Sequence, residues 1–324
     1  MRTHDWRGVF PAITTPFRDD LTVDLDALGA HVRWLVERGS RGIIALGSLG
    51  EAQTLAFDEK VRVLERCREA LGARAPLVAG ISALSTAEAV ALARAAERAG
   101  CDGLMVLPPY VYRGDDREML AHVEAVLAAT PLSCMLYNNP IAYGTDFHPR
   151  QVLELTRHQN LHAVKESSGD VRRITAIRAL AGDGLAIFVG LDDLIVEGVA
   201  AGAVGWVAGL VNALPDESVR LFDLARAGRA AEARELYDWF LPLLRLDTCP
   251  KFVQLIKLVQ AAVGRGSARV RPPRLELAGA ELEQARRLIG ERLAKRTGGA
   301  GGSIGAGAAG AAGAAGAVAG GGAA

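Results

Sequence analysis

Lys165 is the residue of this sequence whose type and position most directly suggest chemistry. Arginine carries most of the cationic charge, and the only lysines are Lys60, Lys165, Lys251, Lys257 and Lys295. The other four lie in segments that are predicted to be amphipathic helices, where a solvent-exposed lysine is ordinary. Lys165 instead ends a short apolar segment and precedes a Ser-Ser-Gly loop. Partial desolvation there favours the neutral amine that attacks carbonyl carbons, although a strand-end lysine that reaches solvent is the alternative.

A glycine-bounded turn, Gly47-Ser-Leu-Gly-Glu51, offers a candidate anion site. Gly47 and Gly50 would let the backbone N–H groups of Ser48 and Leu49 converge on a carboxylate. A plain turn between a strand and a helix would have the same composition.

Three further positions follow predicted strands and are candidates for the same site. Tyr137 could exchange a proton with a substrate oxygen, or it could simply close the core. Gly190 and Asp192 come after the seventh apolar segment, where they could contact a polar substrate. Asp192 and Asp193 could equally cap the next helix.

Alternating apolar and amphipathic segments predict the elements that must position these residues. Amphipathic helices are predicted at residues 24–37, 58–71 and 85–98. Short apolar strands are predicted at residues 8–14, 42–46, 77–81, 103–107, 132–137, 161–165, 185–189 and 203–208. Such strands joined by helices are typical of a parallel sheet covered on both faces, and eight units indicate an α/β fold of the closed (β/α)8 barrel type. A Rossmann fold would show G-x-G-x-x-G after the first strand, and residues 11–16 contain no such motif.

The remainder of the chain predicts a helical C-terminal extension. Helical patterns cover residues 215–226, 230–263 with a break near 247–250, and 279–293. We therefore divide the chain into barrel strands and helices at 1–212 and a last barrel helix with a C-terminal helical region at 213–296. Residues 297–324 are almost entirely Gly and Ala, and their composition predicts disorder.

Composition narrows the function. The formal net charge is zero, which gives no indication of a nucleic-acid partner. No apolar run reaches a membrane span and no signal peptide is evident, so we expect a cytoplasmic protein without membrane contact. The histidines and cysteines lack metal-ligand spacing, and we expect neither a metal nor an organic cofactor.

Four ordered motifs resemble the dihydrodipicolinate synthase / N-acetylneuraminate lyase family over roughly residues 6–295. They are Gly8-Val-Phe-Pro-Ala-Ile-Thr-Thr-Pro-Phe17, Gly47-Ser-Leu-Gly-Glu51, Tyr137-Asn-Asn-Pro140 and Val164-Lys-Glu-Ser-Ser-Gly169. The resemblance implies a barrel that assembles as a homotetramer. It also implies that Lys165 forms a Schiff base with a 2-oxo acid, that Tyr137 shuttles protons, and that Ser48 and Leu49 bind the carboxylate.

Departures from the family pattern bear on the substrate. The synthases that condense pyruvate with aspartate semialdehyde carry an arginine in the stretch that here reads Ile141-Ala-Tyr-Gly144. In the turn that resembles the family's Gly-Thr-Thr-Gly-Glu motif, Leu49 stands where the family has its second hydroxyl residue. In this family a neighbouring subunit usually contributes a tyrosine to the proton relay of the active site. Val111 stands at the place of that tyrosine, with Tyr110 and Tyr112 on either side.

Residues 204–212, 246–254 and 270–274 look most similar to 1-pyrroline-4-hydroxy-2-carboxylate deaminases. We therefore expect deamination of that cyclic imino acid to 2-oxoglutarate semialdehyde and ammonia. The alternatives are 4-hydroxy-tetrahydrodipicolinate synthase, another pyruvate-dependent aldolase or dehydratase, and a barrel that binds 2-oxo acids without turnover.

Overall fold

Eight parallel strands form a closed barrel, as the alternating pattern predicts. The structure is a computed structural model and describes residues 1–109 and 111–296. The strands pair in the order β1-β8-β7-β6-β5-β4-β3-β2. Their bounds are β1 Gly8–Pro11, β2 Ile43–Ala45, β3 Leu77–Ile81, β4 Gly103–Val106, β5 Ser133–Asn138, β6 Leu161–Glu166, β7 Ala186–Val189 and β8 Gly205–Ala208.

The segment after β1 closes the barrel. The predicted first strand extended to residue 14, whereas β1 ends at Pro11. Beyond it the N–H of Ala12 still bonds to Ala208 on β8, but the N–H of Ile13 bonds to Ile44 on β2 at 2.9 Å. The chain thus passes from one edge of the sheet to the other, and the two edges meet.

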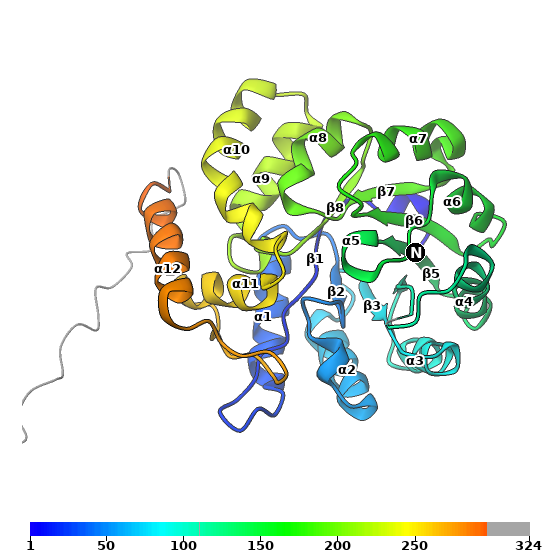
Figure 1. The fold of residues 1–324 in the computed structure, drawn as a ribbon, viewed down its shortest axis with the longest axis horizontal. Coiled ribbons are helices and arrows are strands. Elements are labelled where there is room, and N and C mark those ends of the chain that lie inside the picture. The colour runs from blue at the N-terminus through cyan, green and yellow to red at the C-terminus, as the bar shows by residue number, and fades with distance from the viewer. Residues whose placement is uncertain (110, 297–324) are drawn as a thin grey trace, which may run out of the picture.

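Helices surround the strands (Figure 1). Those within the barrel are α1 Leu25–Glu37, α2 Phe57–Leu71, α3 Thr86–Arg98, α4 Asp116–Ala128, α5 Pro140–Tyr143, α6 Pro149–Leu155, α7 Arg172–Ala181, α8 Ile195–Ala200 and α9 Pro215–Arg226. The predicted starts of α1 and α3 are confirmed, because the side chains of Asp24 and Ser85 accept hydrogen bonds from the first-turn N–H groups of Ala27 and Glu88.

The strands separate two layers of core. Alternate residues of a strand face opposite sides of its sheet. On β5, Met135 and Tyr137 belong to the inner cluster, whereas Cys134 and Leu136 pack outward against the helices. Residues from β6 follow the same alternation, so Ala163 and, two residues later, Lys165 face the interior of the barrel.

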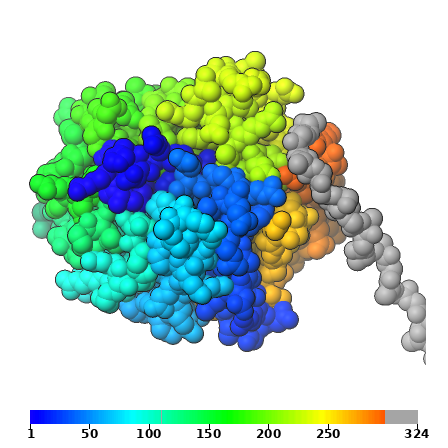
Figure 2. Space-filling model, turned by 180° about the vertical axis from the view of Figure 1, so that it is seen from behind, coloured from blue at the N-terminus to red at the C-terminus, as the bar shows by residue number. Residues whose placement is uncertain are grey.

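Trp6 closes the amino-terminal end of that interior. Its indole Nε1 donates a hydrogen bond to Ser133 Oγ at 2.7 Å, and its ring stacks on Phe10 with centroids 5.8 Å apart. Figure 2 shows the N-terminal segment in dark blue between the cyan and green segments of the chain. The opposite, carboxyl end of the strands is where polar side chains collect.

Three helices form the C-terminal extension: α10 Ala230–Leu244, α11 Phe252–Ala262 and α12 Gly279–Ala294. They gather at one side of the barrel (Figure 1). The predicted break near residues 247–250 is present, as the short 3-10 helix η6 Arg245–Asp247 and the turn after it. The Gly/Ala segment 297–324, predicted to be disordered, lies outside the described residues. Within the described part of the chain, none of the helices has the length and apolarity that a membrane crossing requires.

One prediction about the lysines is wrong. Lys60 and Lys257 lie on α2 and α11, as the helical periodicity predicts, but they are 6% and 2% exposed rather than solvated. Helical periodicity places a residue on a face of its own helix; it does not show what packs over that face. For Lys257 the covering partner is a buried carboxylate, that of Glu51.

Candidate active site

A cavity of about 450 Å³ opens at the carboxyl ends of the strands. Most of its walls come from the turn after β2, the ends of β5 to β8 with the loops that follow them, and the break between α10 and α11. Ala12, Met105 and Arg274 complete the lining. Lys165, Tyr137, Gly47, Ser48, Leu49 and Gly190 all line it. The structure therefore brings together every predicted site residue except Asp192.

Lys165 is held in the cavity without an anionic partner. Its side chain is 6% exposed, and its Nζ lies 4.0 Å from the centroid of the Tyr137 ring. Among the described residues its Nζ has no hydrogen bond and no ion pair. Gly190 makes room for this side chain, since a Cβ at residue 190 would lie 2.6 Å from Lys165 Cε and 1.9 Å from Ser167 Oγ.

Tyr137 is oriented by a neighbour that the sequence motif contained without a role. Asn139 Nδ2 donates to Tyr137 Oη at 3.0 Å, while Asn139 Oδ1 caps α5 by accepting from the N–H of Ala142 at 2.9 Å. The phenol oxygen thus accepts from Asn139, which leaves the phenol hydrogen available for a substrate atom or another hydroxyl.

The turn after β2 has the form expected of an anion site. Leu46 and Glu51 adopt positive φ angles of 63° and 55°, which bend the backbone sharply around Gly47-Ser48-Leu49-Gly50. The N–H groups of Ser48 and Leu49 donate no hydrogen bond to any described residue. Free, adjacent N–H donors at such a bend suit a carboxylate. Gly50 is required by close approach, because a Cβ there would lie 3.0 Å from the carbonyl oxygen of Ile13.

Tyr143 is a cavity residue that sequence reasoning missed. It lies on α5, where its hydroxyl shares a hydrogen bond with Ser48 Oγ, and its ring packs edge-on against Tyr137 with centroids 5.7 Å apart. Sequence reasoning assigned Tyr143 no role, because residues 141–144 differ from the synthases by the arginine that they lack and show no other signal. Ala142, at that place, lines the cavity with a methyl group.

Tyr112 and Val111 lie elsewhere. Tyr112 is exposed and its hydroxyl donates to the carboxylate of Glu118, and it does not line the cavity. Val111 is 93% exposed with a φ of 71°, an unusual conformation for a β-branched residue. Tyr110 lies outside the described residues. Within this chain, Tyr143 is therefore the described tyrosine that meets Ser48.

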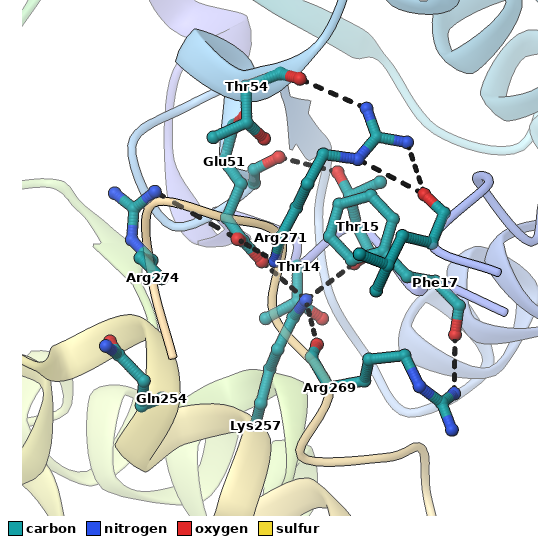
Figure 3. A network of polar contacts seen from close by, with 12 residues as sticks. Thr14, Thr15, Phe17, Glu51, Thr54, Gln254, Lys257, Arg269, Arg271 and Arg274 are labelled. Atoms are coloured by element: carbon teal, nitrogen blue, oxygen red, sulfur yellow. Dashed lines mark hydrogen bonds and ion pairs between the residues drawn. The ribbon is translucent and has the colours of Figure 1, made fainter. Parts of the chain in front are cut away.

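A buried ionic network supports the turn from behind (Figure 3). The carboxylate of Glu51 is fully buried and accepts hydrogen bonds from Lys257 Nζ and from the N–H of Arg271. Lys257 Nζ also donates to the carbonyl oxygens of Thr15 and Arg269, each at 2.8 Å. Burial lowers the pKa of Lys257, whereas Glu51 acts to raise it. The network ties the turn after β2 to α11 and to the segment that follows α11.

The geometry does not support the predicted substrate contact of Asp192. Its carboxylate is fully buried and accepts hydrogen bonds from Trp206 Nε1 at 3.0 Å, from Gly209 N at 3.1 Å and from Leu210 N at 2.8 Å. These donors hold the end of β8 and turn the side chain away from the cavity lining. Burial raises the pKa of Asp192 to about 6, while the three N–H donors act to lower it.

The described residues contain no group of three or more His, Cys, Asp or Glu side chains that could hold a metal ion. Cys67, Cys101 and Cys134 are buried and unpaired, and burial raises the pKa of each thiol. None of these three lines the cavity, and all three belong to the hydrophobic core.

Comparison with known proteins decides the family. The model of the dihydrodipicolinate synthetase family matches residues 5–292. The chain belongs to this family. It is a class I lyase, and the family resemblance of the sequence motifs is confirmed.

The relatives carry more specific names. A 4-hydroxy-tetrahydrodipicolinate synthase from Methanoculleus marisnigri is 33% identical over 290 residues, which cover 88% of this chain and 98% of the relative. The structure of a protein of the same name from Methylacidiphilum fumariolicum has a TM-score of 0.85 at 30% identity and covers 89% of this chain and 97% of its own. A dihydrodipicolinate synthase from Acinetobacter baumannii, complexed with pyruvate, has a TM-score of 0.84 at 28% identity, with 88% and 98% covered.

Proposed function

We propose that Lys165 forms a Schiff base with C2 of a compact 2-oxo or cyclic imino acid. The observation that carries this proposal is the Lys165 amine itself, buried in the cavity 4.0 Å from the Tyr137 ring centroid and without an ionic partner. An amine so placed is desolvated and accessible to a ligand, which is what attack on a carbonyl or imine carbon requires.

The surrounding groups supply the other steps. The N–H groups of Ser48 and Leu49 bind the substrate carboxylate and orient C2 toward the amine. Tyr137 moves protons between the Lys165 nitrogen, the departing oxygen or nitrogen at C2, and the Ser48 hydroxyl. Once formed, the iminium withdraws electrons from C3, so a proton leaves C3 to give an enamine.

Two fates of that enamine distinguish the candidate reactions. The names of the relatives favour addition to an aldehyde, as in 4-hydroxy-tetrahydrodipicolinate synthase. The cavity of this chain supports instead the deamination of 1-pyrroline-4-hydroxy-2-carboxylate. Ala142 offers no cation beside the Tyr137 end of the cavity, and the guanidinium of Arg274, which also lines the cavity, lies 4.0 Å from the Glu51 carboxylate. The Leu49 side chain adds an apolar surface.

Borohydride trapping tests the shared step. Incubation with pyruvate or with the imino acid, followed by reduction, should add the substrate mass to the peptide that contains Lys165, and Lys165→Ala should remove this adduct. An adduct elsewhere, or turnover without any adduct, would overturn the proposal. Ammonia release from the imino acid then supports the deaminase, whereas consumption of aspartate semialdehyde with pyruvate supports the synthase. An adduct with neither activity would indicate a binding protein.

The homotetramer implied by the family resemblance is also a proposal. The exposed Val111, held at a φ of 71°, marks a loop suited to packing against a second copy. Sedimentation velocity of the wild type and of Val111→Asp tests this, since a charged residue in that contact should shift the protein toward smaller species.

A further inference from the structure

Asp247 is a carboxyl group in the cavity that has no structural partner. It ends the 3-10 helix η6 in the break between α10 and α11 and lines the cavity that contains Lys165. Its Oδ1 is shielded from solvent and has no hydrogen-bond partner among the described residues. A buried polar atom without a partner is costly, so such an atom at a substrate cavity indicates a ligand group that would complete it.

Gly209 sets the position of this carboxyl group. A Cβ at Gly209 would lie 2.0 Å from Asp247 Oδ1 and 2.4 Å from its Cγ. Only a glycine therefore permits the Asp247 side chain to lie against the end of β8. Asp192 fixes the same backbone from the other side, through its bonds to the N–H groups of Gly209 and Leu210.

The two carboxyl groups differ in what surrounds them. Asp192 accepts three kinds of N–H donor, which stabilise its negative charge despite burial. Asp247 has no such donor. Burial raises the pKa of Asp247 well above its ordinary value, and the charge of Asp192 raises it further, while Lys165 and its positive charge act in the opposite direction. The N–H donors stabilise the charge of Asp192, whereas no such donor stabilises a charge on Asp247, so Asp247 holds a proton more readily than Asp192 does, a division of roles that acid catalysis uses.

The strand order places Asp247, through its contact with the end of β8, on a third side of the cavity, distinct from those of Lys165 and the turn after β2. In the closed sheet, β8 is separated by one strand from β6, which carries Lys165, and by one strand from β2, which precedes the carboxylate turn. A substrate with C1 at the turn and C2 on Lys165 has its more distant carbons free to extend toward β8. C4 is the nearest of these carbons that can carry a leaving oxygen in conjugation with the enamine.

We propose that Asp247 is the general acid that protonates the C4 hydroxyl of the Schiff-base intermediate, so that this hydroxyl leaves as water. This inference rests on the proposed Schiff base at Lys165. The enamine nitrogen pushes its electron pair to re-form the iminium, the C2–C3 π electrons form a C3–C4 double bond, and the C4–O bond breaks. The oxygen keeps the bonding pair and takes the Asp247 proton, and the carboxylate regains a proton from the water that enters for the later hydrolysis.

The test separates acid catalysis from a structural role. Asp247→Asn keeps the shape of the side chain and removes the transferable proton. It should lower ammonia release from 1-pyrroline-4-hydroxy-2-carboxylate by about 100-fold or more, while Asp247→Glu regains part of the rate. Asp193→Asn is the matched control: Asp193 is half-buried beside Asp192, ion-paired with Arg245 and absent from the cavity lining, and its variant should stay within about twofold of wild type.

A substrate that needs no acid provides the decisive arm. Fluoride leaves as an anion without prior protonation, so the 4-fluoro analogue should release fluoride from Asp247→Asn at nearly the wild-type rate. Borohydride trapping of pyruvate on Lys165 should also persist in this variant and shows that its site is intact. Equal losses for the hydroxy and fluoro substrates, near-wild-type ammonia release by Asp247→Asn, or a wild type that forms the adduct but releases no ammonia would overturn the role of Asp247. A wild type that forms no adduct would instead overturn the proposed function.

Discussion

Tyr137 and Lys165 are register partners on the adjacent parallel strands β5 and β6, and the Lys165 amine lies 4.0 Å from the centroid of the Tyr137 ring. Register partners on neighbouring parallel strands point to the same side of the sheet, here the interior of the barrel. The face of the Tyr137 ring is therefore presented to the Lys165 amine. Such a ring stabilises a positive charge above it, including that of an iminium.

The ring and the hydroxyl of Tyr137 can be separated by substitution. Tyr137→Phe keeps the face that contacts Lys165 and removes the proton carrier. It should still be trapped by borohydride with pyruvate, but its kcat should fall by about 10²- to 10⁴-fold. Peptide mass and steady-state rates measure the two effects, and an unchanged kcat would remove Tyr137 from the proton path.

Gly190→Ala should displace the Lys165 amine by steric contact alone, without removing a polar group. The added methyl would lie 2.6 Å from Lys165 Cε and 1.9 Å from Ser167 Oγ, so the Lys165 side chain must shift. A displacement of about 1 Å at a reacting group costs on the order of 100-fold in kcat. Gly184→Ala is the control, since nothing lies within 4 Å of its added methyl. Equal activity of both variants would contradict the packing described for Lys165.

Tyr143→Phe tests whether Tyr143 adds a third hydroxyl to those of Tyr137 and Ser48 from within the same chain. Because Tyr143 bonds to Ser48 Oγ beside Tyr137, its loss should lower kcat by about 10-fold or more with little change in KM. Tyr112→Phe, which removes an exposed hydroxyl that bonds to Glu118, should leave the rate near wild type. A large loss of kcat in Tyr112→Phe with none in Tyr143→Phe would assign the proton relay to the loop that contains Tyr112.

Removing only one of the two charges of the Glu51–Lys257 pair should lower the free energy of unfolding substantially. Lys257→Met leaves the fully buried Glu51 carboxylate with only the more distant guanidinium of Arg274, at 4.0 Å, and removal of one partner of a buried pair costs about 3–5 kcal/mol in the free energy of unfolding. Lys251→Met, which breaks an exposed pair with Glu281, should cost less than about 1 kcal/mol. Denaturant titration compares them. The double variant Glu51→Gln, Lys257→Met should be more stable than Lys257→Met alone if the stranded charge is the cause.

His31 should make stability fall in acid. Burial lowers the pKa of His31 to about 4, while its Nε2 contacts Asn212 Oδ1 at 2.9 Å. Between pH 6.5 and 4 the unfolded chain binds a proton that the folded protein does not, so the free energy of unfolding decreases as pH falls, by at most about 3 kcal/mol. Urea titrations should show this slope reduced in His31→Gln and retained in a variant of exposed His4.

The barrel was predictable because its signals are local. A short apolar strand that is buried on both faces and a helix with one apolar stripe each show their signal within a single segment. Eight repeats of the pair then leave few ways to bury all the apolar residues. Lys165, Tyr137 and the turn at residues 47–50 could be assigned to one site on the same ground, since the carboxyl ends of parallel barrel strands converge at one end.

The remaining site residues meet only through tertiary packing. Tyr143 and Ser48 are 95 residues apart, and Lys257 and Glu51 are 206 residues apart. Asp247 reaches Gly209 from a break between two C-terminal helices. These contacts depend on how the short helix α5 is oriented after β5 and on how α11 packs against the barrel. The spacing of apolar residues within one segment carries no information about either.

By itself, the sequence determined the barrel and the strand ends at which Lys165 and the turn at residues 47–50 lie, because short apolar strands and amphipathic helices are local signals. The tertiary structure alone decided the directions of side chains beyond the strand ends. It turned Asp192 toward the backbone of β8, buried Lys257 against Glu51, and left the Asp247 carboxyl unpartnered in the cavity. Those directions follow from which long-range neighbours fill the space around each residue, and that is settled only when the whole chain packs.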